Sequence, residues 1–151
     1  MAKEVMQLKG ADFLTKKLEA MGPTVSNRAA SRGVQKAAMY ARKEFRKEAP
    51  RGETGKLRKS ITVKAYGRPK NGGKKKAYVG LRKIKGESQG LWYYRTLEFP
   101  HARGEPYKPF FEKTWESIKR KAAQMIIDET TKALYAEAAK VYRQSLSRKG
   151  K

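Results

Sequence analysis

The sequence predicts an α+β fold, in which two N-terminal helices and one long C-terminal helix pack on a small antiparallel β-sheet. Apolar residues recur at three- and four-residue steps over residues 24–48 and again over 110–142, and alternating apolar residues lie between these ranges. With 151 residues, of which 38 % are hydrophobic, the chain can bury one core. We therefore expect a single domain over residues 1–151.

The N-terminal region begins with a short apolar stretch and continues into a short helix. Residues 5–8 are expected to form a strand or an extended arm, which Gly10 ends. Apolar residues at helical spacing then precede the break at Gly22-Pro23, and they are Phe13, Leu14, Leu18 and Met21. This pattern predicts a short amphipathic helix over residues 11–21.

A longer helix is predicted over residues 24–48. Its apolar stripe is rich in alanine and comprises Val25, Ala29, Ala30, Val34, Ala37, Ala38, Ala41 and Phe45. Because alanine side chains are small, another element can approach this stripe closely. Pro50 disfavours helical backbone at Ala49, so we expect the helix to stop there.

Three strands are predicted in the middle of the chain. Residues 61–65 alternate apolar and polar side chains, and residues 77–81 pair back on them as a hairpin. Residues 91–99 form the third strand and hold the densest aromatic cluster, Trp92, Tyr93, Tyr94 and Phe99. These side chains fit core packing or a subunit interface better than base stacking, since neighbours on a strand face opposite ways.

One long helix is predicted from residue 110 to about residue 142. Its apolar stripe comprises Phe111, Trp115, Ile118, Ala122, Ile126, Leu134, Ala138 and Val141. The basic residues 143–151 that follow are expected to be a mobile, frayed tail. A nucleic-acid arm is the alternative interpretation of this tail.

Positive charge is the strongest compositional feature. The 37 Lys and Arg residues outnumber the 14 Asp and Glu residues, which gives a formal net charge of +23. Such an excess destabilises a compact monomer by self-repulsion, so an anionic partner is expected: nucleic acid, an acidic protein surface or an anionic membrane. Lysine is the more abundant of the two, which favours attraction to a backbone over reading of base edges.

Several function classes are excluded or disfavoured. The chain has no cysteine, which excludes disulfides, thiolate zinc sites and cysteine nucleophiles and fits a reducing cytosol. No apolar run reaches the ~20 residues that span a bilayer, and residues 1–10 lack the apolar core of a signal peptide. His101, the only histidine, is expected in a loop without metal ligands beside it. We therefore expect no enzyme activity, metal or cofactor.

Two groups of charged residues have a predicted place. Acidic residues on the helices are interpreted as surface charges that balance lysines, and they are Glu44, Glu48, Glu112, Glu116, Asp128 and Glu129. The loop over residues 67–76 contains five basic residues and no acid, namely Arg68, Lys70, Lys74, Lys75 and Lys76. This loop is either a mobile, solvated hairpin tip or an arm that reaches DNA phosphates or an acidic neighbour.

Three segments carry a family resemblance. The first is Ala49-Pro50 followed by Thr54-Gly55-Lys56-Leu57-Arg58-Lys59-Ser60-Ile61, the second runs from Trp92-Tyr93-Tyr94 to Leu97-Glu98-Phe99, and the third is Pro106-Tyr107-Lys108-Pro109-Phe110-Phe111. In this order they resemble the head–tail joining or tail-completion (neck) proteins of lambdoid long-tailed phages, over roughly residues 5 to 135. Pro100 and Lys108 depart from the family pattern. The positions that follow it are Pro50, Thr54, Gly55, Leu57, Arg58, Ser60, Ile61, Tyr93, Tyr94, Glu98, Phe99, Pro109 and Phe110.

The resemblance implies a structural virion protein at the head–tail junction, present in the host cytoplasm during assembly. It implies a homo-oligomeric ring that contacts the connector or adaptor and the tail terminator or tail tube, and through which genomic double-stranded DNA passes without being read. No membrane partner is expected. The alternative is a stand-alone basic nucleic-acid-binding protein, which accounts for the charge without the resemblance.

The first of the three segments is expected to be mainly architectural, because Thr54 and Gly55 suit a tight turn and Leu57 and Ile61 suit burial. Thr54 is also a candidate N-cap for a short helical turn. Arg58 is the one member that we expect to contact a neighbouring subunit.

Overall fold

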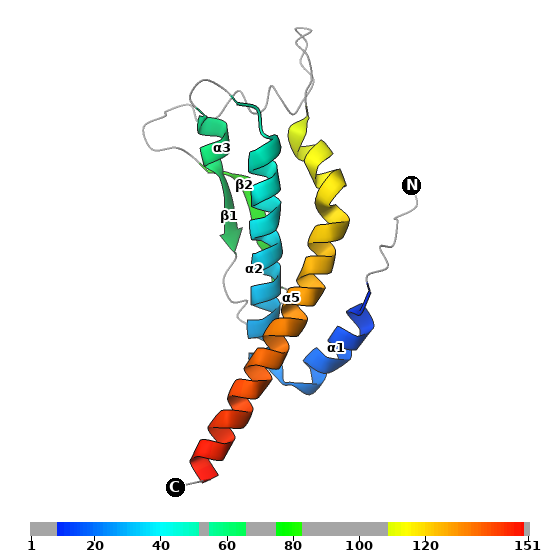
Figure 1. Cartoon of the computed structure of the whole chain (residues 1–151), viewed down its shortest axis with the longest axis vertical. Helices are drawn as coiled ribbons and strands as arrows, with labels where there is room; N and C mark the ends of the chain where they lie inside the picture. The colour runs from blue at the N-terminus through cyan, green and yellow to red at the C-terminus, as the bar shows by residue number, and fades with distance from the viewer. Residues whose placement is uncertain (1–8, 52–54, 66–74, 83–108, 150–151) are drawn as a thin grey trace. The chain divides into compact units, whose positions relative to one another are not determined.

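A computed structural model of the chain describes residues 9–51, 55–65, 75–82 and 109–149 (Figure 1). Its elements are α1 (Ala11–Ala20), α2 (Pro23–Glu48), α3 (Lys56–Ser60), β1 (Ile61–Ala65), β2 (Ala77–Leu81) and α5 (Phe110–Lys149). β1 and β2 form a two-stranded antiparallel sheet, with Ile61 opposite Leu81 and Ala65 opposite Ala77. This arrangement confirms the predicted class of two N-terminal helices, a long C-terminal helix and a small antiparallel sheet.

Several predicted elements lie outside the described residues. They are the apolar stretch at 5–8, Thr54, the greater part of the basic loop and the third strand over 91–99. At the N-cap position of α3 stands Gly55, whose φ of 58° lies in the left-handed region that favours glycine. The helix α5 ends at Lys149, several residues beyond the predicted end near residue 142.

The described residues gather in two compact units, and α2 and α5 each contribute to both. The first unit comprises residues 9–37, 75–76 and 120–149. The second comprises residues 38–51, 55–65, 77–82 and 109–119.

The first unit is built from helices alone. Its buried cluster joins α1 to α2 and α5 and consists of Leu14, Ala29, Ile127, Ala133 and Leu134. Leu18, Met21 and Val25 pack against this cluster and are half-buried, as their spacing predicts. Phe13, which was predicted on the same face, is instead 52 % exposed, with the Lys17 ammonium 5.5 Å from its ring centroid.

Within the first unit, α2 and α5 approach each other closely at Gly33. A Cβ atom on Gly33 would lie 2.0 Å from Thr130 Oγ1 and 2.7 Å from the carbonyl oxygen of Ile126. Only a residue without a side chain allows this approach, because interiors are packed without spare space. The close contact agrees with the prediction that the small-residue stripe of α2 lets another element come near.

The buried face of α5 differs from the predicted stripe. The predicted stripe includes Trp115, Ile126 and Val141, yet these side chains are 47 %, 36 % and 52 % exposed. The buried positions are instead Phe110, Thr114, Ile118, Ala122, Ile127, Thr130, Ala133, Leu134 and Glu137. This face includes small and polar side chains, which a search for large apolar residues does not detect. The helical period therefore placed these three residues in the correct helix but not on its buried face.

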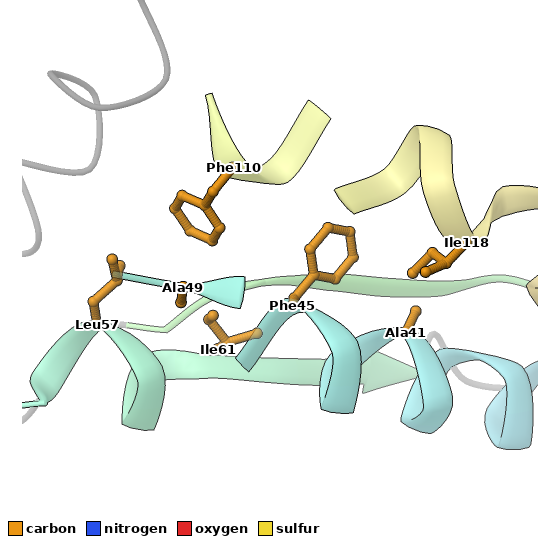
Figure 2. Close-up of a cluster of buried hydrophobic side chains, with 7 residues drawn as sticks. All are labelled: Ala41, Phe45, Ala49, Leu57, Ile61, Phe110 and Ile118. Atoms are coloured by element: carbon orange, nitrogen blue, oxygen red, sulfur yellow. The ribbon is translucent and has the colours of Figure 1, made fainter. Parts of the chain in front are cut away.

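The second unit holds the bulkier core. Side chains from α2, α3, β1 and α5 meet in one cluster, which consists of Ala41, Phe45, Ala49, Leu57, Ile61, Phe110 and Ile118 (Figure 2). The rings of Phe45 and Phe111 stack with their centroids 4.4 Å apart. Val79 and Leu81 of β2 pack against the cluster, so the hairpin is anchored to the helices by its apolar residues.

Candidate functional site

Family-pattern residues from separate segments meet in the core of the second unit. Leu57 and Ile61 of the first segment lie in the same buried cluster as Phe110 of the third (Figure 2). Ser60 is fully buried, and its hydroxyl donates a hydrogen bond to the carbonyl oxygen of Leu57 (2.6 Å). In the described part of the pattern, these residues therefore build the fold. Outside the described residues lie Thr54, Tyr93, Tyr94, Glu98 and Phe99.

Arg58 ties α3 to the end of α2. Its Nε donates to the carbonyl oxygen of Ala49 (2.8 Å), and its Nη2 donates to that of Lys47 (3.0 Å). The last carbonyls of a helix have no partner inside the helix and carry partial negative charge, so a guanidinium is well suited to them. Arg58 thus has a defined role within the chain, and its contact with a neighbouring subunit stays a prediction.

Arg46 makes a matching link in the opposite direction. Its Nε donates to the carbonyl oxygen of Ile61 (3.0 Å) and its Nη2 to that of Lys59 (3.4 Å). The backbone N–H of Arg82 donates to the carbonyl oxygen of Ser60 (3.0 Å), which brings the end of β2 to the same corner. Burial, followed by the charges of Arg42 and Arg82, lowers the pKa of Arg46 from its ordinary value.

These contacts gather three arginines on one side of α2. We call Arg42, Arg46 and Arg82 the arginine face. Arg42 and Arg46 are half-buried, and Arg82 is exposed. Among the described residues, none of the three has a carboxylate oxygen within 4.0 Å. In the described part of the chain, these positive charges therefore have no carboxylate to balance them.

A groove of about 670 Å³ lies between α2 and the start of α5. We call it the acidic groove, and it is lined by Glu44, Glu48, Pro50, Pro109, Phe110, Lys113, Thr114, Ser117 and Ile118. Phe110, Thr114 and Ile118 are its buried lining, whereas Glu48 and Lys113 are exposed. Within the described ranges, neither Glu44 nor Glu48 has a basic nitrogen within 4.0 Å.

This finding corrects the prediction that Glu44 and Glu48 balance lysines. The same prediction is confirmed elsewhere, since Glu116 pairs with Lys119 and Glu129 with Lys132 (2.9 Å). The two paired carboxylates each bond a lysine three residues later, whereas Lys47 and Arg51, at the same spacing from Glu44 and Glu48, form no such ion pair among the described residues. Glu44 and Glu48 instead border a groove with an apolar lining.

In the first unit, a buried carboxylate collects several cations. Glu137 is 4 % exposed, with Arg32 Nη1 at 2.9 Å, Lys140 Nζ at 3.5 Å and Arg28 Nη1 at 3.7 Å from its carboxylate oxygens. Burial acts to raise the pKa of Glu137, but the charges of Lys140, Arg32 and Arg28 and the hydrogen bond from Lys140 lower it overall. Charge is thus partly compensated here, unlike on the arginine face.

Two residues of the predicted basic loop lie among the described residues. Of the basic loop, Lys75 is half-buried and Lys76 exposed, while Arg68, Lys70 and Lys74 lie outside the described residues. His101 lies outside them as well. The described ranges contain no group of three potential metal-binding side chains. In those ranges, no helix has the length and apolar character that a membrane span requires.

Sequence reasoning missed the opposition of two charged surfaces on α2. Arg42, Glu44, Arg46 and Glu48 alternate in sign at every second residue. Two residues of a helix correspond to a rotation of about 200°, so the two signs point to nearly opposite sides. This alternation of charge in the sequence could have predicted the two opposed surfaces.

A comparison with protein families matches residues 12–99, more than half of the 151 residues, to the HK97-gp10-like family, described as "Bacteriophage HK97-gp10, putative tail-component". The match includes the first two segments of the resemblance and stops before the third. No curated protein and no solved structure is similar enough to the chain to count as a match.

Proposed function

Because the chain belongs to the HK97-gp10-like family of bacteriophage tail components, we propose that it is a neck or tail-completion subunit that joins the tail to the head. Membership gives the chain a structural, tail-related role and a place in the virion, in contact with other phage structural proteins. The position at the head–tail junction, the ring and the passage of DNA are the parts that we propose.

The packing of the family-pattern residues supports a structural role. Leu57, Ile61 and Phe110 belong to the scaffold of the second unit, and the surfaces beside them carry charge that the described residues leave uncompensated. Such surfaces suit contacts with other proteins or with DNA better than chemistry on a small substrate. We propose that the protein has no catalytic activity.

The net charge of +23 supports a location beside polyanions. DNA that passes through a ring attracts lysine and arginine irrespective of its sequence, because the attraction is to phosphates. Acidic surfaces of the connector or tail terminator would attract them as well. In this proposal, the basic residues serve both partners.

The test is to remove the protein from the phage that encodes it. Electron microscopy of the lysate should then show filled heads and separate tails, and supplying the wild-type chain in trans should restore joined particles. Particles that lack the chain and still join heads to tails in normal numbers would refute the proposal. Loss of tails altogether would also refute it, because that result would place the chain in tail assembly.

The second candidate is a stand-alone basic nucleic-acid-binding protein, and the net charge is the observation that favours it. Such a protein should bind duplex DNA as a free monomer or dimer, with an affinity that falls steeply as salt rises. It should also be absent from purified virions. Mass spectrometry of purified particles therefore separates the two candidates.

A further inference from the structure

We propose that copies of this chain associate head to tail, with the arginine face of one copy seated against the acidic groove of the next. The inference deepens the proposed ring and rests on it. Both surfaces belong to the second unit.

The two surfaces flank the buried stripe of α2 on opposite sides. The stripe includes Ala41, Phe45 and Ala49. At about 100° per residue, Arg42 and Arg46 fall on one side of this stripe and Glu44 and Glu48 on the other. One copy therefore presents both signs at once, in different directions.

Each surface lacks a partner of opposite charge among the described residues. Arg42, Arg46 and Arg82 stand together without a carboxylate, and the Arg46 guanidinium is held in place by the carbonyls of Ile61 and Lys59. Glu44 and Glu48 are like charges four residues apart, an arrangement that by itself destabilises a helix slightly. An arriving pair of guanidiniums would relieve both repulsions.

The groove also offers shape. Its lining combines the buried side chains of Phe110 and Ile118 with the two proline rings. Two carboxylates and one exposed lysine, Lys113, complete the lining, so acid outnumbers base there. An arginine side chain has an apolar stem and a planar charged end, so it can lie along such a lining and still reach a carboxylate. We propose a second copy of the chain as the partner, because its arginine face supplies both the apolar stems and the charged ends.

A contact between two different faces also suits a ring. When the surfaces that meet are not the same patch, each added copy leaves one free surface of each kind, and the chain of copies closes if the rotation allows. A contact between identical patches would instead stop at a dimer. The opposition of signs across α2 thus favours a head-to-tail series of copies, which the proposed ring would close.

The test uses two charge-reversal variants. Glu44→Lys with Glu48→Lys reverses the acidic groove, and Arg42→Glu with Arg82→Glu reverses the arginine face. Arg46 is kept, since it holds two backbone carbonyls. Sedimentation velocity at low ionic strength should show association of the wild-type chain, and each variant alone should associate at least about tenfold more weakly, because like charges then meet.

Mixing the two variants is the decisive step. In an alternating series, each reversed groove meets a reversed arginine face and each natural groove meets a natural one, so association should return. Added salt should weaken both the wild-type and the mixed series, because exposed charges are screened.

Matched controls change the net charge equally, away from both surfaces. Asp12→Lys with Glu19→Lys matches the groove variant, and Lys16→Glu with Lys36→Glu matches the other, all at exposed positions of the first unit. These controls should associate as their net charge alone dictates, without complementation on mixing. Circular dichroism should show that every variant keeps its helices.

Three results would overturn the inference: a wild-type chain that stays monomeric throughout, a single variant that associates as the wild type does, or a mixture that fails to recover.

The neck role is tested separately by particle joining. If heads and tails join normally when the groove variant replaces the wild-type chain, the proposed interface is refuted but the neck role is not. Particles that join normally without the chain would end the neck role, whatever sedimentation shows.

Discussion

The two units hold their helices together in different ways. In the first unit, α2 and α5 meet through small side chains, so closely that a single added carbon on Gly33 would lie 2.0 Å from Thr130 Oγ1. In the second, large side chains such as Phe45 and Phe110 fill the space, and Arg46 and Arg58 add bonds to backbone carbonyls. Adding side-chain atoms should therefore destabilise the first unit, whereas removing large side chains should destabilise the second.

The largest effect is expected on deleting bulk from the second unit. Phe45→Ala removes a ring that is 4 % exposed and stacked on Phe111, so it should lower the free energy of unfolding by about 3–5 kcal/mol. Trp115→Ala is the matched control, because Trp115 is 47 % exposed, and its loss should amount to about 1 kcal/mol or less. Denaturant titration measures both. Equal losses would contradict the described burial.

Addition to the first unit should come next. Gly33→Ala improves helix propensity by about 1 kcal/mol, but its Cβ would meet Thr130 and the carbonyl oxygen of Ile126, and overpacking costs about 1–3 kcal/mol. Because two of the contacts would be shorter than 3.0 Å, we expect the cost of overpacking at the upper end of this range, and therefore a net loss of about 2 kcal/mol in the free energy of unfolding. Gly80→Ala is the control, since no atom lies within 4 Å of its added Cβ. A stabilised Gly33→Ala variant would refute the close crossing.

A smaller loss is expected at the α2–α3 corner. Arg58→Met keeps the apolar stem but removes the hydrogen bonds to the carbonyls of Ala49 and Lys47, so it should cost about 1–2 kcal/mol. Lys59→Met removes a neighbouring exposed charge and should change the free energy of unfolding by about 0.5 kcal/mol or less. If the two variants unfold alike, the corner is not held by Arg58.

The smallest effect depends on pH and sharpens the description of the first unit. Because the folded-state pKa of Glu137 is lowered, its carboxylate contributes stability that is present above the unfolded value of about 4.3 and is lost as pH falls through the folded pKa. The stability difference between wild type and Glu137→Gln should thus shrink as pH falls below about 4. Glu19→Gln, at an exposed position, is the control. A difference that is constant with pH would contradict the ion network.

Much of the fold could be predicted because it depends on local pattern. The helix α2 was placed almost to the residue, since an alanine-rich period ends at Pro50. The hairpin followed from alternation over 61–65 and 77–81. The burial of Leu57 and Ile61 was also correct, because both are large apolar residues beside a turn.

What could not be predicted depends on neighbours distant in the sequence. Gly33 of α2 leaves room for Thr130 on the buried face of α5, whereas the larger and more apolar Ile126 is 36 % exposed. Bonds from Arg46 and Arg58 end on carbonyls, which every residue has, so no pair of residue types reveals them. The unpaired state of Glu44 and Glu48 likewise follows from what surrounds them in space.

The choice of acceptors at the α2–α3 corner has a consequence in acid. Carboxylates become neutral as pH falls, and an ion network centred on Glu137 then disappears, whereas carbonyl oxygens do not titrate and arginine stays charged. The bonds from Arg46 and Arg58 therefore persist under conditions that dismantle ion pairs. At low pH, the backbone around Ala49 and Ile61 should therefore stay hydrogen-bonded to the two arginines after the carboxylates have lost their charge.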